Sequence, residues 1–181
     1  MDDFFSSWLY EKTSDNSSRF ILGQRGKRTL ACIGINPSTA TPEKLDNTLT
    51  CVRRFAFSLG YDSWIMLNVY PQRATCPDRL HKACNEELHT ENLLQIEKVI
   101  CEYKPDIWAA WGTIIERRSY LAKCLIDIFN CTQKHDLRWF TIGKRSKAGH
   151  PHHPLYLSKT LGLEKFDMAD YVASILKKCD R

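Results

Sequence analysis

The chain has 181 residues, a formal net charge of +5 and a charged fraction of 26%. These values are typical of one globular domain and exclude a mainly disordered or fibrous protein. No apolar run approaches the roughly 20 residues that a membrane-spanning helix needs. The N-terminus, MDDFFSSWLYEK, lacks the basic and apolar regions of a secretory signal. We therefore expect one domain over residues 1–181 that is cytoplasmic, monomeric and without a membrane partner.

The eight cysteines form no CxxC pair, so the zinc-ribbon and thioredoxin motifs are absent. Several of them lie in apolar periodic segments, where a free cysteine packs like a small hydrophobic residue. We interpret them as reduced thiols of a cytosolic protein and expect no cofactor. An iron–sulfur cluster built from scattered cysteines is the alternative, although their spacings fit no local ligand run.

The first 18 residues are polar and rich in serine, and we expect them to form a loosely packed lead-in. Two β-type runs follow, at residues 19–22 and 27–35. The sequence between them, GQRG, predicts an antiparallel hairpin.

From Thr29 onward, strand patterns alternate with helical patterns. The predicted strands are residues 29–35, 64–69, 107–111 and 137–142. The predicted helices are residues 49–59, 93–103 and 121–129, and a last helix capped by Asp167. This order predicts an α/β fold, specifically a three-layer α/β/α sandwich with a central, mostly parallel four-stranded sheet and the N-terminal hairpin.

Parallel strands bring their carboxyl ends to one rim of the sheet, where ligands bind. The loop after the first of these strands holds Gly34, which permits close approach to the backbone, and Pro37, which stiffens the exit. The Asn36 amide can hold a water or a polar ligand, and Ser38 and Thr39 suit an anion. A simple strand-to-helix turn with capping hydroxyls is the alternative.

The second strand ends in LNVYP, where Asn68 interrupts an apolar run. A buried amide needs partners for its donors and its acceptor, and it can match the edge of a nucleobase. The alternative is a structural asparagine bonded to a neighbouring loop. The third strand ends at Trp111 and Gly112, and we expect Trp111 to be core or pocket wall more often than a stacking platform.

The last loop, GHPHHPLY, holds three histidines between prolines: His150, His152 and His153. Such imidazoles can donate to an oxyanion that develops during a reaction. A metal site is the rival interpretation, but no matching ligand cluster appears elsewhere in the sequence, so we predict no metal. An exposed loop without a role is the third possibility.

These pieces, in this order, resemble the uracil-DNA glycosylase superfamily. GINPS at residues 34–38 is similar to the GINPG element of the mismatch-specific uracil/thymine branch. LNVYP, from residue 67, is similar to the strand end that presents an asparagine to the base. AAWG at residues 109–112 and HPHHPL at residues 150–155 are similar to the LLWG-type strand and the HPSPL loop.

The sequence resembles more closely the domain of unknown function 1643. Members of that family carry an NPSTA turn, an N-x-x-x-x-RAT-x-P segment and a GHP-x-HPLYL loop. Here these read NPSTA at residues 36–40, NVYPQRATCP at residues 68–77 and GHPHHPLYL at residues 149–157. The resemblance runs from about residue 19 to residue 157, and its strength lies in the combination.

The glycosylase resemblance implies roles for these residues. Asn36 would position the attacking water, Asn68 would bond the Watson–Crick edge of the base, and His150 or alternatively His153 would stabilise the leaving base. Ser38 and Thr39 would lie near a phosphate, and Leu155 or Tyr156 would fill the gap that a flipped nucleotide leaves. The other substrate contacts that we predict are Gly34, Pro37, Tyr70, Arg73, Trp111, Gly112 and His152.

This sequence also departs from the glycosylase pattern. It has Asn36 where an aspartate would be a stronger base, and the histidine loop has an extra residue. Arg73 lies outside the pattern and suggests an extra contact with a phosphate. We expect an N-glycosidase acting on a base in DNA. The alternatives are an enzyme of free or modified nucleotides and a non-catalytic binder of DNA or nucleotide.

Overall fold

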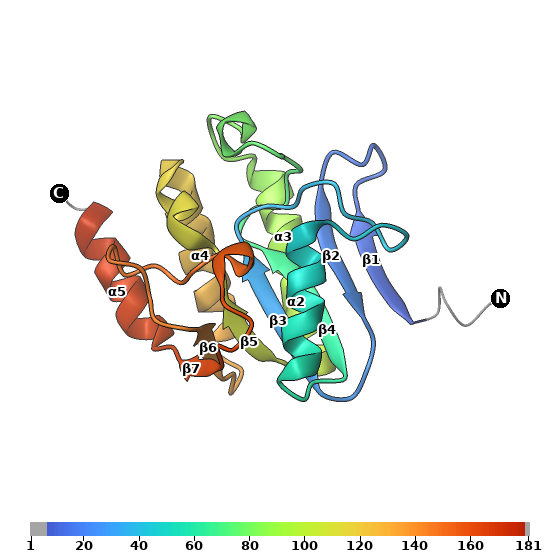
Figure 1. Cartoon of the computed structure of the whole chain (residues 1–181). Coiled ribbons are helices and arrows are strands. Elements are labelled where there is room, and N and C mark those ends of the chain that lie inside the picture. The colour runs from blue at the N-terminus through green and yellow to red at the C-terminus, as the bar shows by residue number, and fades with distance from the viewer. Residues whose placement is uncertain (1–6, 180–181) are drawn as a thin grey trace.

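The computed structural model describes residues 7–179, which form a seven-stranded mixed sheet with helices on both faces (Figure 1). The strands are β1 (Trp8–Lys12), β2 (Arg19–Gln24), β3 (Thr29–Gly34), β4 (Ser63–Asn68), β5 (Asp106–Ala109), β6 (Trp139–Ile142) and β7 (Leu163–Lys165). The helices are α2 (Asn47–Ser58), α3 (Glu86–Tyr103), α4 (Ser119–Thr132) and α5 (Met168–Cys179). Three short 3₁₀ helices are η1 (Pro77–Arg79), η2 (Gly112–Glu116) and η3 (Pro154–Tyr156).

The strand order is β1-β2-β4-β3-β5-β6-β7. Strand β3 pairs in parallel with β4 and β5, and β5 pairs in parallel with β6. The remaining pairs are antiparallel. The predicted α/β class is confirmed, but the sheet is larger than the four strands that we expected. Strand β7 escaped prediction because its three residues are mostly exposed and carry no apolar run.

The predicted hairpin between residues 19–22 and 27–35 is wrong, because β4 lies between β2 and β3 in the sheet. Gly23 is not a turn residue. It lies inside β2 opposite Ile65, where a Cβ would come within 2.4 Å of the Trp64 carbonyl oxygen. The glycine therefore allows strands β2 and β4 to approach each other closely.

Strand β2 instead forms an antiparallel pair with β1, which lies in the segment expected to be a loose lead-in. Trp8 of β1 is buried, and its ring meets the Trp64 ring edge-on at 6.1 Å. Residues 8–12 are therefore part of the sheet, while residues 1–6 of the predicted lead-in lie outside the described residues.

The predicted helix ends are confirmed where they depend on local signals. The Asp46 side chain accepts a hydrogen bond from the Leu49 N–H at 2.9 Å and so caps α2. Gly60 follows that helix with φ +82°, as expected of a residue just beyond a C-terminus. Asp167 accepts from the Asp170 N–H at 2.9 Å and caps α5.

The two faces of the sheet form separate apolar cores. Helix α2 packs Leu49, Val52 and Phe55 on the face that carries Trp64 and Met66. Helices α3, α4 and α5 cover the opposite face, and Figure 1 shows α2 in front of the sheet with α3 and α4 behind it. Within the described residues, no helix is both long enough and apolar enough to cross a membrane.

Candidate functional site

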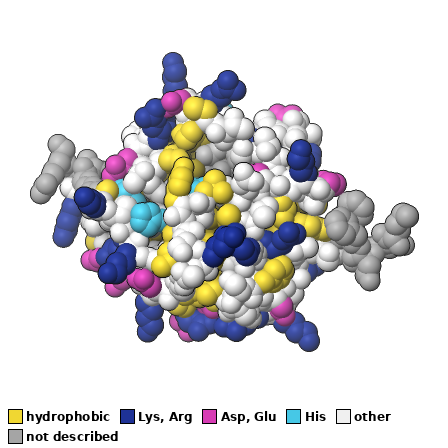
Figure 2. Space-filling view, viewed as in Figure 1, with side chains coloured by type: hydrophobic (Ala, Val, Ile, Leu, Met, Phe, Trp, Pro, Cys, Tyr) yellow, Lys and Arg dark blue, Asp and Glu magenta, His cyan; other side chains and the backbone are white. Residues whose placement is uncertain are grey.

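A cavity of about 390 Å³, which we call the rim cavity, lies at the carboxyl ends of β3 and β4. The loop after β3, the N-terminus of α2 and the segment around η3 enclose it. Figure 2 shows this side of the molecule, where hydrophobic side chains form a band with a histidine beside it. The residues of its lining that matter most are Arg19, Asn36, Asp46, Met66, His153 and Tyr156.

Asn36 lies in the rim cavity, as predicted from its place after a buried strand. Both amide hydrogens have partners, because Nδ2 donates to the Pro37 carbonyl at 2.9 Å and to the Ala74 carbonyl at 2.8 Å. Oδ1 is therefore the atom that can accept a further hydrogen bond from water or a ligand. An amide oxygen can orient a water molecule but cannot act as a strong base.

The neighbours of Asn36 divide between two hollows. Gly34, Pro37 and Ser38 also line the rim cavity. Thr39 is exposed and, with Ser38 and Arg73, lines a separate open hollow. The structure thus brings the predicted NPS residues together and leaves Thr39 outside.

Asn68 ends β4 and is fully buried. Neither its Oδ1 nor its Nδ2 has a hydrogen-bond partner among the described residues. Alternation along β4 puts its side chain on the face of Trp64 and Met66, and Met66 lines the rim cavity. An unpartnered buried amide costs about 1–3 kcal/mol, so this position is destabilising unless a ligand supplies the bonds.

Gly34 is paired with Asn68 in the sheet. A Cβ at Gly34 would lie 3.4 Å from Asn68 Oδ1 and 2.5 Å from the Met66 methyl carbon. The Met66 side chain therefore fills the space that a side chain at residue 34 would occupy, next to the buried amide. Because a methionine side chain is flexible, it can move to let a ligand reach Asn68.

Two charged residues of the rim cavity were not predicted from the sequence. Asp46 caps α2 through Oδ1 and lines the cavity. Arg19 also lines it, is 1% exposed, and donates from Nη1 to the Ala40 carbonyl at 3.2 Å. Burial, reinforced by the neighbouring Arg73, lowers the pKa of Arg19 to about 10, while Asp46 acts in the opposite direction.

The sequence held a weak signal for both of these residues. An arginine opens the apolar run RFIL, and an aspartate stands directly before the α2 pattern. A helix cap can be predicted from the residues next to it in the sequence. That Asp46 and Arg19 line the same cavity depends on the order of the strands in the sheet.

His153 is the histidine of the last loop that reaches the rim cavity. Burial lowers its pKa below the ordinary value, and the carboxylate of Asp46 partly offsets this effect. Its Nδ1 accepts a hydrogen bond from the Leu155 N–H at 3.4 Å. In the neutral ring the proton then lies on Nε2, which can act as a donor.

His150, the other candidate, is 2% exposed and does not line the rim cavity. Its Nδ1 lies 2.6 Å from the Tyr171 hydroxyl, and its Nε2 lies 2.9 Å from Glu116 Oε1. Trp111 is also buried and donates from Nε1 to the same hydroxyl at 2.9 Å. The structure therefore puts His150 and Trp111 in a bonded network beneath α5, which corrects their placement beside Asn36.

Two further predicted contacts have structural partners. Tyr70 is buried on the α3 face, where its hydroxyl lies 2.8 Å from His81 Nδ1 and accepts from the Asn85 N–H at 3.1 Å. Arg73 donates to the Ser38 carbonyl at 2.5 Å and to the Tyr10 hydroxyl at 2.9 Å. Arg73 thus fastens the loop after β3 and does not line the rim cavity.

Four predicted contacts remain, of which two line the rim cavity. Gly112 lies outside the lining and beside His153, and its φ of +65° is a conformation that favours glycine. Leu155 and Tyr156 line the mouth and are 43% and 82% exposed. His152 is half-buried and lies outside the lining.

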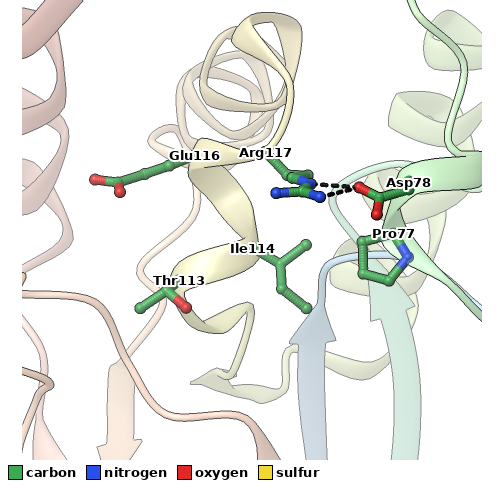
Figure 3. Close-up of a pocket in the computed structure, with 6 residues that line it drawn as sticks. All are labelled: Pro77, Asp78, Thr113, Ile114, Glu116 and Arg117. Carbon is green, nitrogen blue, oxygen red and sulfur yellow. Dashed lines mark hydrogen bonds and ion pairs between the residues drawn. The ribbon is translucent and has the colours of Figure 1, made fainter.

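A second hollow of about 430 Å³ adjoins the rim cavity and shares Pro77 and Ile114 with it. Figure 3 shows this hollow between η1 and η2, with the Arg117–Asp78 ion pair on one side and Glu116 directed away from it. The two hollows therefore lie next to each other on the surface.

Arg138 lies away from the rim. It forms two hydrogen bonds of 2.8 Å with Asp106, the residue that begins β5 at the opposite, amino ends of the parallel strands. In the described part of the chain, no group of three or more His, Cys, Asp or Glu side chains could hold a metal ion.

The fold and the rim cavity define an α/β protein with a cavity at the carboxyl ends of parallel strands. Residues 19–155 match the family model described as protein of unknown function (DUF1643), and the chain belongs to this family. No curated protein and no solved structure matches the chain.

Proposed function

We propose that the protein is an N-glycosidase that hydrolyses the bond between a base and its sugar in DNA. The observation that carries the proposal is the buried amide of Asn68, which has no partner among the described residues and lies next to Gly34 and Met66 of the cavity lining without lining the cavity itself. A nucleobase edge presents a neighbouring donor and acceptor, which an amide matches with two hydrogen bonds. The resemblance of the rim motifs to the uracil-DNA glycosylase superfamily supports the same reading.

The other cavity residues fit the steps of this hydrolysis. Asn36 Oδ1 orients a water, and the Asp46 carboxylate accepts its proton as the oxygen attacks the anomeric carbon. The bond from sugar to base breaks, and its electron pair leaves with the base. The Nε2–H of neutral His153 then donates to the oxygen of the base on which negative charge develops.

The mouth of the cavity favours a nucleotide that has been flipped out of DNA. Leu155 and Tyr156 are large, exposed side chains beside the opening. Enzymes that extrude a base commonly insert an apolar side chain into the gap. The second hollow, which shares Ile114 with the rim cavity, offers room for the strand beyond the flipped nucleotide.

The test is base release from single- and double-stranded oligonucleotides that carry uracil, hypoxanthine, xanthine or a mismatched thymine. We expect abasic sites with at least one of these bases, and loss of at least about 100-fold in rate for Asn68→Leu and Asp46→Asn. His152→Ala is the matched control, because His152 adjoins His153 but does not line the cavity, and it should keep the wild-type rate. No release by folded wild-type protein from any of these DNAs would contradict the proposal.

A further inference from the structure

We infer that one end of the rim cavity, formed by Arg19 and the N-terminus of α2, is a binding subsite for a phosphate group. This inference rests on the proposed function for the identity of the whole ligand, because it names the anionic group that accompanies the base. It does not depend on hydrolysis, since a phosphate can bind there without any base.

Arg19 is the first observation. Its side chain lines the cavity although it is 1% exposed, and its only hydrogen bond among the described residues is to the Ala40 carbonyl. Its Nε has no partner there. A guanidinium group in this position has lost its hydration without gaining a carboxylate partner. It therefore retains the capacity to bind an anion that enters the cavity.

The charges around Arg19 do not balance. Arg73 lies beside it, and both side chains donate to the Ala40 carbonyl. Neither arginine forms an ion pair with a described carboxylate. Asp46 is the single acidic residue in the lining. Arg73 itself lies outside the lining, but with His153 neutral the two neighbouring guanidinium groups and the Asp46 carboxylate sum to a net charge of +1.

The N-terminus of α2 is the second observation. Asn47 and Thr48, the first two residues of this 12-residue helix, line the cavity. Their N–H groups have no partner within the helix, whereas the Leu49 N–H is already bonded to Asp46. The helix dipole adds positive potential at the same point.

Together these groups match the chemistry of a phosphate. The guanidinium fork can bond two phosphate oxygens. The free N–H groups of α2 can bond the others, and Ser38 adds a hydroxyl to the lining. The phosphate can be the monoester of a free nucleotide or the diester of a DNA strand, since both present the same oxygens.

The first experiment measures the thermal midpoint of the full chain against inorganic phosphate, with sodium chloride added to keep the ionic strength constant. We expect a saturable rise for the wild type. Arg19→Met keeps the length of the side chain without its charge, and it should weaken phosphate binding at least about tenfold.

A second variant keeps the inference testable if Arg19→Met does not fold. Asn47→Pro removes one N–H at the first helical position, where proline is well tolerated. We expect it to weaken phosphate binding by roughly two- to fivefold. Glu86→Pro makes the same change at the first position of α3, away from the cavity, and should leave phosphate binding unchanged.

Titrations with nucleoside 5′-monophosphates and with a single-stranded oligonucleotide distinguish the two sources. If Arg19→Met weakens the binding of the monophosphate, the subsite is assigned to free nucleotides. If Arg19→Met weakens the binding of the oligonucleotide, the subsite is assigned to DNA. Inorganic phosphate should raise the thermal midpoint of Asn68→Leu as it does that of the wild type. The phosphate subsite can therefore be confirmed even if the protein hydrolyses no base. Absence of a saturable phosphate effect in the wild type, or an equal effect in Arg19→Met, would overturn the inference.

Discussion

The rim cavity and the network beneath α5 are both built from polar side chains near the ends of strands, yet they differ in how those side chains are bonded. Beneath α5, both nitrogens of His150 have partners, and the Tyr171 hydroxyl joins His150 to Trp111. At the rim cavity, the Arg19 Nε and the Asn68 amide, which lies next to the lining residue Gly34, have no partners among the described residues.

We propose that this difference separates structural from ligand-binding polar groups at these two places, although other buried atoms, among them Trp108 Nε1 and His89 Nδ1, also have no partner among the described residues. A buried group whose hydrogen bonds are complete within the protein stabilises the fold and has nothing left to offer a ligand. A buried group without partners destabilises the fold and gains them only from a ligand. The four variants below test this comparison, from the largest expected effect to the smallest.

His150→Ala should have the largest effect on stability. It removes one of the two partners of the Tyr171 hydroxyl and opens a cavity in the core beneath α5. We expect the free energy of unfolding in urea to fall by about 3 kcal/mol. A loss below about 1 kcal/mol would show that the network does not hold this part of the fold.

Arg73→Met should come next, because it releases the loop after β3. Arg73 bonds the Ser38 and Ala40 carbonyls and the Tyr10 hydroxyl. We expect a loss of about 2 kcal/mol in the free energy of unfolding. Arg79→Met is the control, since the described hydrogen bonds of that exposed residue involve only its backbone, and it should stay within about 0.5 kcal/mol of wild type.

Asn68→Leu should act in the opposite direction. Leucine has a similar shape and removes an amide that has no partner, so we expect the ligand-free protein to gain about 1 kcal/mol. Asn92→Leu is the contrast, because buried Asn92 donates to the Asn68 carbonyl at 2.9 Å and its loss should destabilise the protein. Equal destabilisation by both changes would contradict the assignment of Asn68 to ligand binding.

His153→Gln should have the smallest effect on stability, visible only in its pH dependence. Burial lowers the pKa of folded His153 from 6.5, so the unfolded chain takes up this proton first as the pH falls. The contribution of His153 to stability is therefore complete above pH 6.5 and decreases below it, down to the folded pKa. Unfolding curves between pH 7 and pH 5 should show a shallower decline for His153→Gln, and an unchanged slope would contradict this assignment.

The sequence predicted those features that depend on neighbours along the chain. The cap at Asp167 and the glycine after α2 are set within a few residues, and the helix patterns predicted both. The cap at Asp46 is equally local but was not predicted. The position of Asn68 at the end of a buried strand could also be predicted from the sequence, because a polar side chain interrupts an apolar run.

The features that the sequence missed depend on contacts between distant segments. The strand order puts β4 between β2 and β3, and only that order brings Arg19 to the rim. His150 and His153 are three residues apart in one motif, so their different surroundings could not be predicted. Tyr171 holds the first, and the second lies beside Gly112 and lines the cavity.

The most direct test of this account compares base release by His153→Gln and by His150→Gln at pH 7, each rate corrected for the fraction of folded protein. The substrate is the oligonucleotide that wild-type protein cleaves best. We predict a loss of at least about 100-fold for His153→Gln and a rate within about threefold of wild type for His150→Gln. The reverse order would contradict the claim that the unpartnered groups of the rim cavity form the active site.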